Sequence, residues 1–313
     1  MSERSTQLVC PRSFAAHYGS AHRRTLVLGG GGLFFVAWQV AYLQGLAKRG
    51  VVLADASLVV GTSAGSMIAA IVTSGGMRRF AAQIAALARF PAVINALAPA
   101  DELTVSQERA LDMFRTAQDS TPETLAAIGH AALAADTPPQ RSLRRSAGLM
   151  IASRKWPSPA LRITSVDAYT GERLIFSQRS DVPVATAAAA SSSVPGLFAP
   201  QLIHDRFCMD GGVSGSGTHT DLVAGAEKAL VVSLSESFVA QGVSREGGMT
   251  QASGAYLAEM EALRAAGTRV FARGPETVNM DELMKPSSVP GALAMGDRQA
   301  SADAQAVSEF WND

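Results

Sequence analysis

Short apolar runs that stop at glycines alternate with longer apolar segments over the first 75 residues of the chain. Residues 25–28 form a run that ends at four consecutive glycines, the pattern of a buried strand that enters a turn. The pattern then predicts a helix over 36–49, a second buried strand over 56–60 and a helix of small and apolar residues over 64–73. Two successive units of strand, glycine turn and helix favour a parallel sheet covered by helices.

The middle third of the chain, residues 77–156, is rich in alanine at helical spacing and is interrupted by prolines. Because proline ends helices, this stretch predicts several short helices that form a cap or insertion. Strand character returns at 161–166 and 173–176, which predict a hairpin joined around Thr170-Gly171. Further along, the pattern predicts a small-residue helix at 184–190, one strand at 202–209, a buried strand at 229–234, a helix at 255–266, a short strand at 270–271 and then a tail punctuated by glycine and proline.

The composition is that of a folded protein. Of the 313 residues, 47% are hydrophobic and 17% are charged, which supplies a buried core and excludes disorder over most of the chain. Basic and acidic residues each number 27, so the net charge is zero and nucleic-acid binding is disfavoured. The two cysteines, Cys10 and Cys208, lack metal-ligand spacing, which argues against a disulfide framework and a zinc site.

Cysteine usage and the absence of a targeting pattern both favour the cytoplasm. Residues 1–24 form a polar leader, expected to be flexible, without the apolar core of a secretory signal. The longest apolar run, residues 33–47, is interrupted by glutamines and is short for a segment that spans a bilayer. We therefore expect this run to be a buried helix.

The pentapeptide Gly61-Thr62-Ser63-Ala64-Gly65 has the pattern G-x-S-x-G and lies between a predicted strand and a predicted helix. This is the context of a nucleophile elbow, in which a serine occupies a strained turn with its hydroxyl exposed. The flanking glycines let neighbouring backbone pass closely, and the helix directs its positive end toward the serine oxygen. The alternative is a simple turn in which Ser63 caps the helix.

A serine hydroxyl attacks poorly unless a base lies within hydrogen-bond reach, and the sequence leaves two bases open. His219 is the last of five histidines and would complete a Ser-Asp-His triad of the α/β-hydrolase type. Asp210 ends a predicted strand and precedes Gly211-Gly212, which would leave its carboxylate uncovered in a tight turn. Partial desolvation would make that carboxylate more basic, whereas a plain Asp-Gly-Gly turn is the alternative.

Four consecutive glycines, Gly29 to Gly32, leave backbone N–H groups unshielded after the first strand. Such a loop forms an anion nest or an oxyanion hole. The ending of a nucleoside-triphosphate loop is missing, because Leu33-Phe34-Phe35 follows. A dinucleotide site is a weaker alternative, since its third glycine is missing although Asp55 lies at the spacing of a ribose contact.

The order of these three motifs resembles that of the patatin-like phospholipase family. The resemblance covers about residues 25–235, and 167–172, 189–200 and 229–232 are also similar to stretches at corresponding places in that family. It implies a three-layer α/β/α sandwich with a mainly parallel central sheet. The helices of 77–156 would then be a cap insertion in the catalytic domain, and 236–313 a C-terminal extension that packs on the same domain.

The resemblance also implies roles for the site residues. Ser63 would be the nucleophile and Asp210 its partner in a two-residue dyad, so that no histidine is needed. Oxyanion-hole N–H groups would come from Gly30, Gly31 and Gly32, with Gly29 left open by the register, and further motif glycines are Gly61, Gly65, Gly211 and Gly212. The implied activity is that of a serine lipid acyl hydrolase of the phospholipase A type, which uses neither a metal nor an organic cofactor.

One departure from the family bears on this activity. Leu33-Phe34-Phe35 occupies the place where the family's loop continues with a basic residue and another glycine. These side chains either reshape the oxyanion hole and acyl pocket or pack into the core. A catalytically impaired lipid-binding or regulatory protein of the same fold is therefore one alternative function, and an α/β-hydrolase that uses His219 is the second.

A basic segment offers a contact with lipid. From Arg141 to Lys155 there are five basic residues and no acidic ones. At helical spacing Arg141, Arg144 and Arg145 share one face, and the opposite face carries Leu143, Ala147, Met150 and Ile151. This pattern predicts a helix that makes peripheral contact with an anionic membrane surface. The alternative is that the three arginines form the solvated face of an ordinary packed helix.

Overall fold

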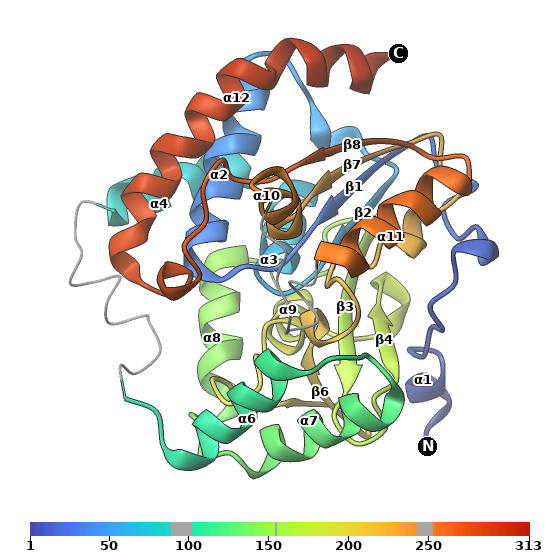
Figure 1. Ribbon diagram of the computed structural model, residues 1–313, viewed down its shortest axis with the longest axis vertical. Helices are drawn as coiled ribbons and strands as arrows, with labels where there is room; N and C mark the ends of the chain where they lie inside the picture. The colour runs from blue at the N-terminus through green and yellow to red at the C-terminus, as the bar shows by residue number, and fades with distance from the viewer. Residues whose placement is uncertain (89–101, 154, 243–252) are drawn as a thin grey trace.

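The computed structural model describes residues 1–88, 102–153, 155–242 and 253–313, which fold around a central β-sheet (Figure 1). Within these residues the sheet runs in the order β5-β6-β3-β2-β1-β7-β8, and β4 pairs with β3 off this path. The strands are β1 (Arg24–Leu28), β2 (Leu58–Gly61), β3 (Leu161–Asp167), β4 (Arg173–Phe176), β5 (Gln201–Ile203), β6 (Arg206–Asp210), β7 (Lys228–Val232) and β8 (Arg269–Arg273).

The centre of the sheet is parallel, as the sequence predicts. Strand β1 pairs in parallel with β2 and β7, β2 with β3, and β7 with β8. The remaining pairs, β3 with β4, β3 with β6 and β5 with β6, are antiparallel. In the register of β1, Leu28 lies beside Gly61 and Val232, so three strands end together at one edge. A site assembled from strand ends is expected at this edge.

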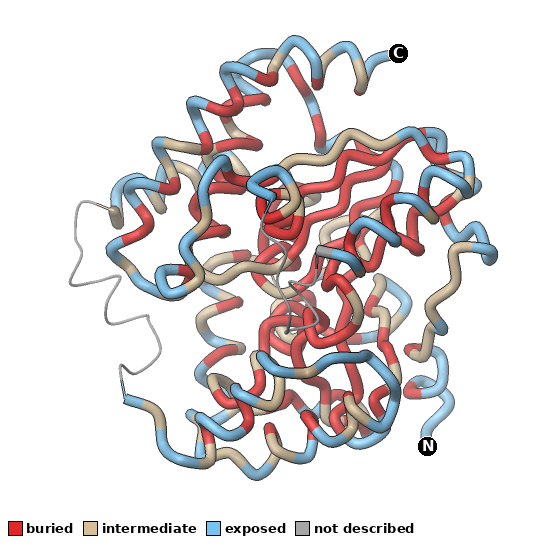
Figure 2. Tube along the Cα trace, viewed as in Figure 1, coloured by how far each residue is buried: buried red, intermediate tan, exposed pale blue. Residues whose placement is uncertain are grey.

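Helices cover both faces of the sheet, which confirms the three-layer arrangement. Leu26 and Leu28 of β1 belong to the larger apolar core, whereas Val27 between them belongs to a second core on the other face. Buried residues are concentrated in the strands and on the inner sides of the helices (Figure 2). The helices are α1 (Glu3–Thr6), α2 (Gly32–Lys48), α3 (Ala64–Thr73), α4 (Met77–Leu87), α6 (Val105–Thr116), α7 (Pro122–Ala134), α8 (Gln140–Ile151), α9 (Val184–Ser191), α10 (Leu234–Ala240), α11 (Ser253–Ala265) and α12 (Val289–Asn312).

The single strand predicted at 202–209 is wrong, because this stretch forms the hairpin of β5 and β6. Gln201 pairs with Cys208 and Ile203 with Arg206 across the hairpin. The chain reverses at His204, whose φ of 54° lies in the left-handed region. Residues 204–206 are polar, but the apolar residues before and after them made the whole stretch resemble one strand.

The tail described in the sequence as punctuated by glycine and proline contains a 24-residue helix, α12. Pro290 stands in its first turn, where proline is tolerated because that N–H has no intrahelical partner. Gly296 lets α12 approach α2 closely, since a Cβ there would lie 2.6 Å from the carbonyl oxygen of Trp38. The indole N–H of Trp38 donates to Gln299 Oε1 at 2.8 Å, and Tyr42 donates to Asp303 Oδ2 at 3.0 Å.

Residues ahead of β1 contact the antiparallel edge of the sheet. Val9 forms a β-bridge with Leu174 of β4, and the Cys10 N–H donates to the carbonyl oxygen of Arg173 at 3.0 Å. Leu8 is only 1% exposed and belongs to the larger core. The segment before β1 thereby brings its side chains into contact with residues of β4 and its surroundings.

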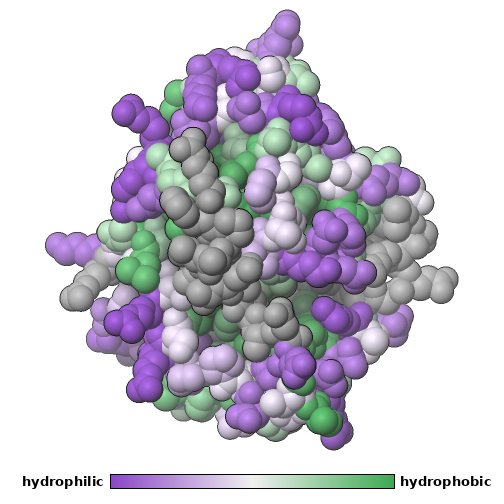
Figure 3. Space-filling view, turned by 90° about the vertical axis from the view of Figure 1, so that its left-hand side faces the viewer, coloured by the Kyte–Doolittle hydropathy of each residue, from purple (hydrophilic) through white to green (hydrophobic). Residues whose placement is uncertain are grey.

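In the part of the chain that the structure describes, no helix combines the length and apolarity needed to cross a bilayer. The face on the side of α4 and α12 carries hydrophilic side chains, with apolar ones in separate patches between them (Figure 3).

Helix α2, the predicted buried helix, begins at Gly32 instead of residue 36 and buries most of its residues.

Candidate active site

Ser63 lies at the turn between β2 and α3 in a conformation that non-glycine residues rarely adopt. Its φ is 53° and its ψ is −127°, and α3 begins at the next residue. Ser63 is the N-cap residue of α3, but within the described chain its hydroxyl makes no capping bond to the helix. The turn instead places the half-buried serine side chain at the N-terminus of a buried helix.

The two glycines of the G-x-S-x-G motif are required by close packing around this turn. A Cβ on Gly65 would lie 2.1 Å from the carbonyl oxygen of Leu28 in β1. A Cβ on Gly61 would lie 2.7 Å from the Cβ of Ala69 and from the Cα of Ser66. Any larger residue at either position would therefore displace the strand or the helix that holds the serine.

Asp210 ends β6 and is 2% exposed. The Ser63 hydroxyl donates to Asp210 Oδ2 at 2.7 Å, and the Gly212 N–H donates to Asp210 Oδ1 at 2.6 Å. Burial raises the pKa of Asp210 to about 7, although both hydrogen bonds oppose this rise because they favour the carboxylate. The carboxyl group can thus accept and return a proton near neutral pH.

Gly211 follows Asp210 and packs directly on β3. A Cβ at this position would lie 2.5 Å from Thr164 Oγ1 and 2.7 Å from the Thr164 carbonyl oxygen. Antiparallel pairing of Ser165 with Asp210 fixes the register in which β6 ends beside β3. Gly211 therefore lets the chain pack tightly against β3, and the next N–H, that of Gly212, bonds to the Asp210 carboxylate.

The structure does not place His219 against Ser63. Its ring is 0% exposed and bonds Gly211 through Nε2, which lies 2.8 Å from the carbonyl oxygen. The other ring nitrogen, Nδ1, is 3.4 Å from Arg173 Nη1. Burial, together with the positive charges of Arg12 and Arg173, holds the pKa of His219 well below its usual value. The serine hydroxyl bonds to Asp210 instead.

The glycine-rich loop passes beside the serine. Gly29 continues the sheet, because its N–H donates to the Val232 carbonyl oxygen at 2.9 Å. Gly30 lies against Ser63, since a Cβ there would be 2.7 Å from Ser63 Cβ. No described residue accepts a hydrogen bond from the N–H of Gly30 or Gly31. These N–H groups, with the N-terminus of α2 at Gly32, form a candidate oxyanion hole.

The Leu33-Phe34-Phe35 segment packs into the protein. Phe35 is 0% exposed and Phe34 is 8% exposed, and both belong to the larger core, against which Leu33 also packs. Phe35 lies under the glycine loop, because a Cβ on Gly31 would be 2.7 Å from its Cβ. These bulky residues therefore support the loop from the core side.

Sequence reasoning missed several residues that shape the site. The Ser63 N–H donates to Ser191 Oγ at 2.9 Å, and Ser66 Oγ donates to the Ser63 carbonyl oxygen at 2.6 Å. Ser191 stands in the stretch 189–200, where the resemblance to the family was visible without showing this contact. The carbonyl oxygen of Leu283 accepts the Phe34 N–H at 3.0 Å, and nothing in the sequence pattern indicated that contact.

The alternative ligand sites receive no support from these contacts. Asp55, considered for a ribose contact, accepts the indole N–H of Trp311 at 2.9 Å and pairs with Arg24. The described part of the chain contains no group of three or more His, Cys, Asp or Glu side chains placed to hold a metal ion. Ser63 and Asp210, with the glycine loop beside them, are thus the chemistry-bearing cluster at the strand ends.

This cluster falls within a stretch that matches a known family. A model of the family described as patatin-like phospholipase matches residues 26–222, more than half of the chain. The chain belongs to the patatin-like phospholipase family. The resemblance found in the sequence is thereby confirmed, and the patatin-like region includes the glycine loop, Ser63 and Asp210.

Solved structures give more distant similarities. VipD from Legionella pneumophila is similar over 95% of this patatin-like chain and 75% of its own, with 12% identity and a TM-score of 0.36. The type III effector protein ExoU is similar over 88% of this chain and 53% of its own, with 20% identity and a TM-score of 0.33. This chain therefore spans about half the length of ExoU. No curated protein matches the chain.

The basic helix of the patatin-like domain is α8. Leu143, Ala147 and Ile151 are buried, so the predicted apolar face packs inward. Arg144 is half-buried and already bonded within the protein, because it donates to Gln140 Oε1 and Gln201 Oε1, both at 2.8 Å. The other two arginines of the predicted surface, Arg141 and Arg145, are exposed. Lys155 is also exposed, whereas Arg154 lies outside the described residues.

Proposed function

We propose that this protein is a cytoplasmic serine lipid acyl hydrolase of the phospholipase A type, with Ser63 and Asp210 as its catalytic dyad. The hydrogen bond of 2.7 Å from the Ser63 hydroxyl to the buried Asp210 carboxylate carries the proposal. Family membership supports a lipid ester as the substrate. Residues 25–235 would form the catalytic domain with its helical insertion at 77–156, and 236–313 would extend it.

Acylation follows from this geometry. As the Ser63 oxygen attacks the ester carbonyl carbon, Asp210 Oδ2 accepts the hydroxyl proton. The carbonyl oxygen becomes an oxyanion that receives hydrogen bonds from the N–H groups of Gly30 and Gly31, beside the N-terminus of α2. When the tetrahedral intermediate collapses, Asp210 returns the proton to the leaving alcohol and an acyl-serine remains.

Deacylation repeats these steps with water as the nucleophile and Ser63 as the leaving group. Asp210 accepts a proton from a water molecule, whose oxygen attacks the acyl carbonyl carbon of the serine ester. The N–H groups of Gly30 and Gly31 hold the second oxyanion. Collapse releases the fatty acid, and the proton on Asp210 returns to Ser63. A pKa near 7 suits Asp210 to this exchange, because the ideal base has a pKa close to the working pH.

The test combines covalent labelling with turnover. Wild type, Ser63→Ala and Asp210→Asn are treated with a fluorophosphonate probe, and intact mass is measured alongside hydrolysis of nitrophenyl butyrate and of a phospholipid. Single labelling of wild type, no labelling of Ser63→Ala and loss of turnover in Asp210→Asn would support the dyad. A folded wild type that neither labels nor turns over would favour the lipid-binding or regulatory alternative.

His219 provides the second discrimination. A triad of the α/β-hydrolase type requires an imidazole at the serine, so replacing His219 would abolish turnover while Asp210→Asn would retain it. If Ser63 and Asp210 form a dyad, Asp210→Asn would instead abolish turnover. The hydrogen bond from Ser63 to Asp210 and the contact of His219 with Gly211 both support the dyad.

We also propose that α8 makes peripheral contact with anionic lipid through Arg141 and Arg145. Both side chains are exposed, and the exposed Leu149 lies one turn further along the helix. Together with Gly148 and Pro183, Arg145 and Leu149 line a surface cavity of about 430 Å³. A cationic rim beside an exposed leucine is complementary to an anionic headgroup above acyl chains.

Vesicle binding tests this contact. Replacing Arg141 and Arg145 by glutamine should weaken binding to vesicles that contain phosphatidylglycerol by about tenfold, and added salt should reduce wild-type binding. The matched control replaces Arg109 and Arg115, two exposed arginines of α6, by glutamine. Equal binding by both double variants would show that α8 has no specific role.

A further inference from the structure

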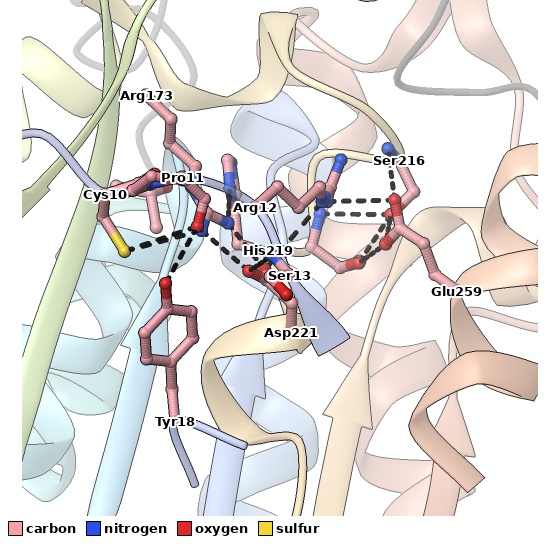
Figure 4. Close-up of polar contacts among 12 residues, drawn as sticks. Cys10, Pro11, Arg12, Ser13, Tyr18, Arg173, Ser216, His219, Asp221 and Glu259 are labelled. Carbon is pink, nitrogen blue, oxygen red and sulfur yellow. Dashed lines mark hydrogen bonds and ion pairs between the residues drawn. The ribbon is translucent and has the colours of Figure 1, made fainter. Parts of the chain in front are cut away.

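The loop after Asp210 is held by a buried polar network that the dyad itself does not use. In Figure 4 this network joins the segment before β1, the loop that carries Ser216 and Asp221, and Glu259 of α11. His219 lies within it and is 0% exposed. A set of buried charged groups at this position calls for an explanation, because burying charge is unfavourable unless every group is paired.

One end of the network is an arginine and aspartate pair. Arg173 donates to both carboxylate oxygens of Asp221, at 2.6 and 2.7 Å, and Asp221 is 0% exposed. Asp221 also accepts the Ser13 N–H at 3.0 Å, and Arg173 donates to the carbonyl oxygens of Cys10 and Pro11. The guanidinium group is thereby fixed with one nitrogen facing the imidazole ring of His219.

A second anchor holds the middle of the same loop. Glu259 accepts the Ser216 N–H and the Thr218 hydroxyl, each at 3.0 Å, and it also accepts the Ser216 hydroxyl. Arg12 pairs with Glu259 at 2.9 Å. The charged groups around His219 are thus Arg12, Arg173, Asp221 and Glu259, and each positive side chain pairs with a negative one.

These contacts decide the protonation of the histidine. Nε2 faces a carbonyl oxygen, which only accepts, so Nε2 must carry a proton and donate. Nδ1 faces a guanidinium nitrogen, which only donates, so Nδ1 must be unprotonated and accept. Two nearby arginines disfavour an imidazolium, consistent with the depressed pKa of His219. His219 is accordingly a neutral ring with its proton on Nε2.

His219 and Asp210 both bond to the same peptide group, the one that joins Gly211 and Gly212. The oxygen that accepts from His219 belongs to Gly211, and the N–H of the same peptide, that of Gly212, donates to Asp210 Oδ1 at 2.6 Å. Asp210 Oδ2 in turn accepts from Ser63. Donation to a peptide oxygen polarises that peptide and strengthens its N–H as a donor. The position and basicity of Asp210 are therefore coupled to the imidazole.

We propose that His219 is a positioning residue for the dyad, which orients and polarises the Gly211–Gly212 peptide so that its N–H holds the Asp210 carboxylate toward Ser63. The catalytic part of this inference rests on the proposed function, whereas the effect on Asp210 does not. Arg173 and Asp221 complete the arrangement by fixing the tautomer and the plane of the ring. His219, the alternative triad base, thus acts on Asp210 through the Gly211–Gly212 peptide and does not contact Ser63.

A matched pair of variants tests the proposal. His219→Gln keeps a donor near the position of Nε2, whereas His219→Met has a similar length and no donor. Both replace a residue whose φ is 53°, so both carry the same backbone cost. We expect His219→Met to lower kcat about 30-fold with little change in KM, and His219→Gln to recover most of that loss. Thermal unfolding of the two variants controls for a purely structural role.

The effect on Asp210 is measured without turnover. Protein labelled with 13C at aspartate side-chain carboxyl groups is titrated by NMR, and the Asp210 signal is assigned by its loss in Asp210→Asn. Losing a polarised donor disfavours the carboxylate, so His219→Met should raise the pKa of Asp210 by about half a unit, and His219→Gln should restore it. An unchanged Asp210 titration in folded His219→Met would overturn the proposal. If the wild type lacks hydrolase activity, this readout still decides the coupling.

The wild-type protein supplies an independent check if His219→Met does not fold. With 15N-labelled histidine, the His219 ring should show the tautomer protonated on Nε2 at all pH values between 6 and 8. A ring protonated on Nδ1 alone, or an imidazolium at pH 6, would contradict the geometry on which the proposal depends. The neutral Nε2–H tautomer would support it.

Discussion

The side-chain oxygens of Ser63 and Asp210 lie 2.7 Å apart although 147 positions separate the two residues in the chain. Strand β2 delivers the serine and strand β6 delivers the aspartate, and β3 lies between them in the sheet. The hydrogen bond is therefore a product of strand order.

The first prediction concerns the pH dependence of activity. The proposed base must be ionised to accept the Ser63 proton, and burial raises the pKa of Asp210 to about 7. The value of kcat/KM for a neutral ester should thus rise about tenfold per pH unit below 7 and level off above it. Rates measured between pH 5 and 9 check this, with Ser63→Ala as the blank. A profile that is flat from pH 5 to 8 would contradict the assignment of Asp210 as the base.

The second prediction concerns the pH dependence of stability. Because the folded-state pKa of Asp210 is raised, the folded protein binds this proton more tightly than the unfolded chain does. The resulting stabilisation is full below about pH 4 and is lost as the pH rises through about 7. Between pH 5 and pH 8, wild type should lose about 2 to 3 kcal/mol relative to Asp210→Asn. Urea unfolding of both proteins at the two pH values measures this difference, and a constant difference would refute the raised pKa.

The third prediction addresses the glycine loop. A methyl group on Gly30 would lie 2.7 Å from Ser63 Cβ and 3.3 Å from its Oγ, so Gly30→Ala should displace Ser63 or the loop. We expect kcat to fall about 100-fold or more, because the oxyanion donors lose their alignment. Gly291→Ala in α12 is the control, since its Cβ would meet no atom within 4 Å. Similar activity in both variants would show that the loop tolerates the change.

The fourth prediction concerns the contact between α2 and α12. Gly296→Ala should destabilise the protein by about 1 to 3 kcal/mol, because the added Cβ would lie 2.6 Å from the Trp38 carbonyl oxygen. Gly291→Ala lies in the same helix with no atom within 4 Å of the new Cβ, so it should be neutral or slightly stabilising. Chemical denaturation compares the two, and equal free energies of unfolding would argue against close packing of α12 on α2.

Local sequence features determined much of the fold and part of the site. Apolar runs ending at glycines located β1 and β2, and small apolar residues located α3, because these elements depend on nearby residues and on burial. The same local pattern placed Ser63 at a strained turn before a helix. Departures occurred where the pattern was ambiguous: the chain turns at His204 and Asp205 within the stretch predicted as one strand, and Pro290 stands in the first turn of α12 instead of preventing a helix.

Only the tertiary structure decided which group faces Ser63. Local motifs left Asp210 and His219 open and only the family resemblance favoured Asp210, because spacing along the chain carries no information about strand order or about which ring atom meets which carbonyl. Antiparallel pairing of β6 with β3 brings Asp210 to the serine, whereas the buried pair of Arg173 and Asp221 keeps His219 on the far side of the Gly211–Gly212 peptide. Contacts between residues distant in sequence depend on packing of the whole chain, which no local pattern encodes.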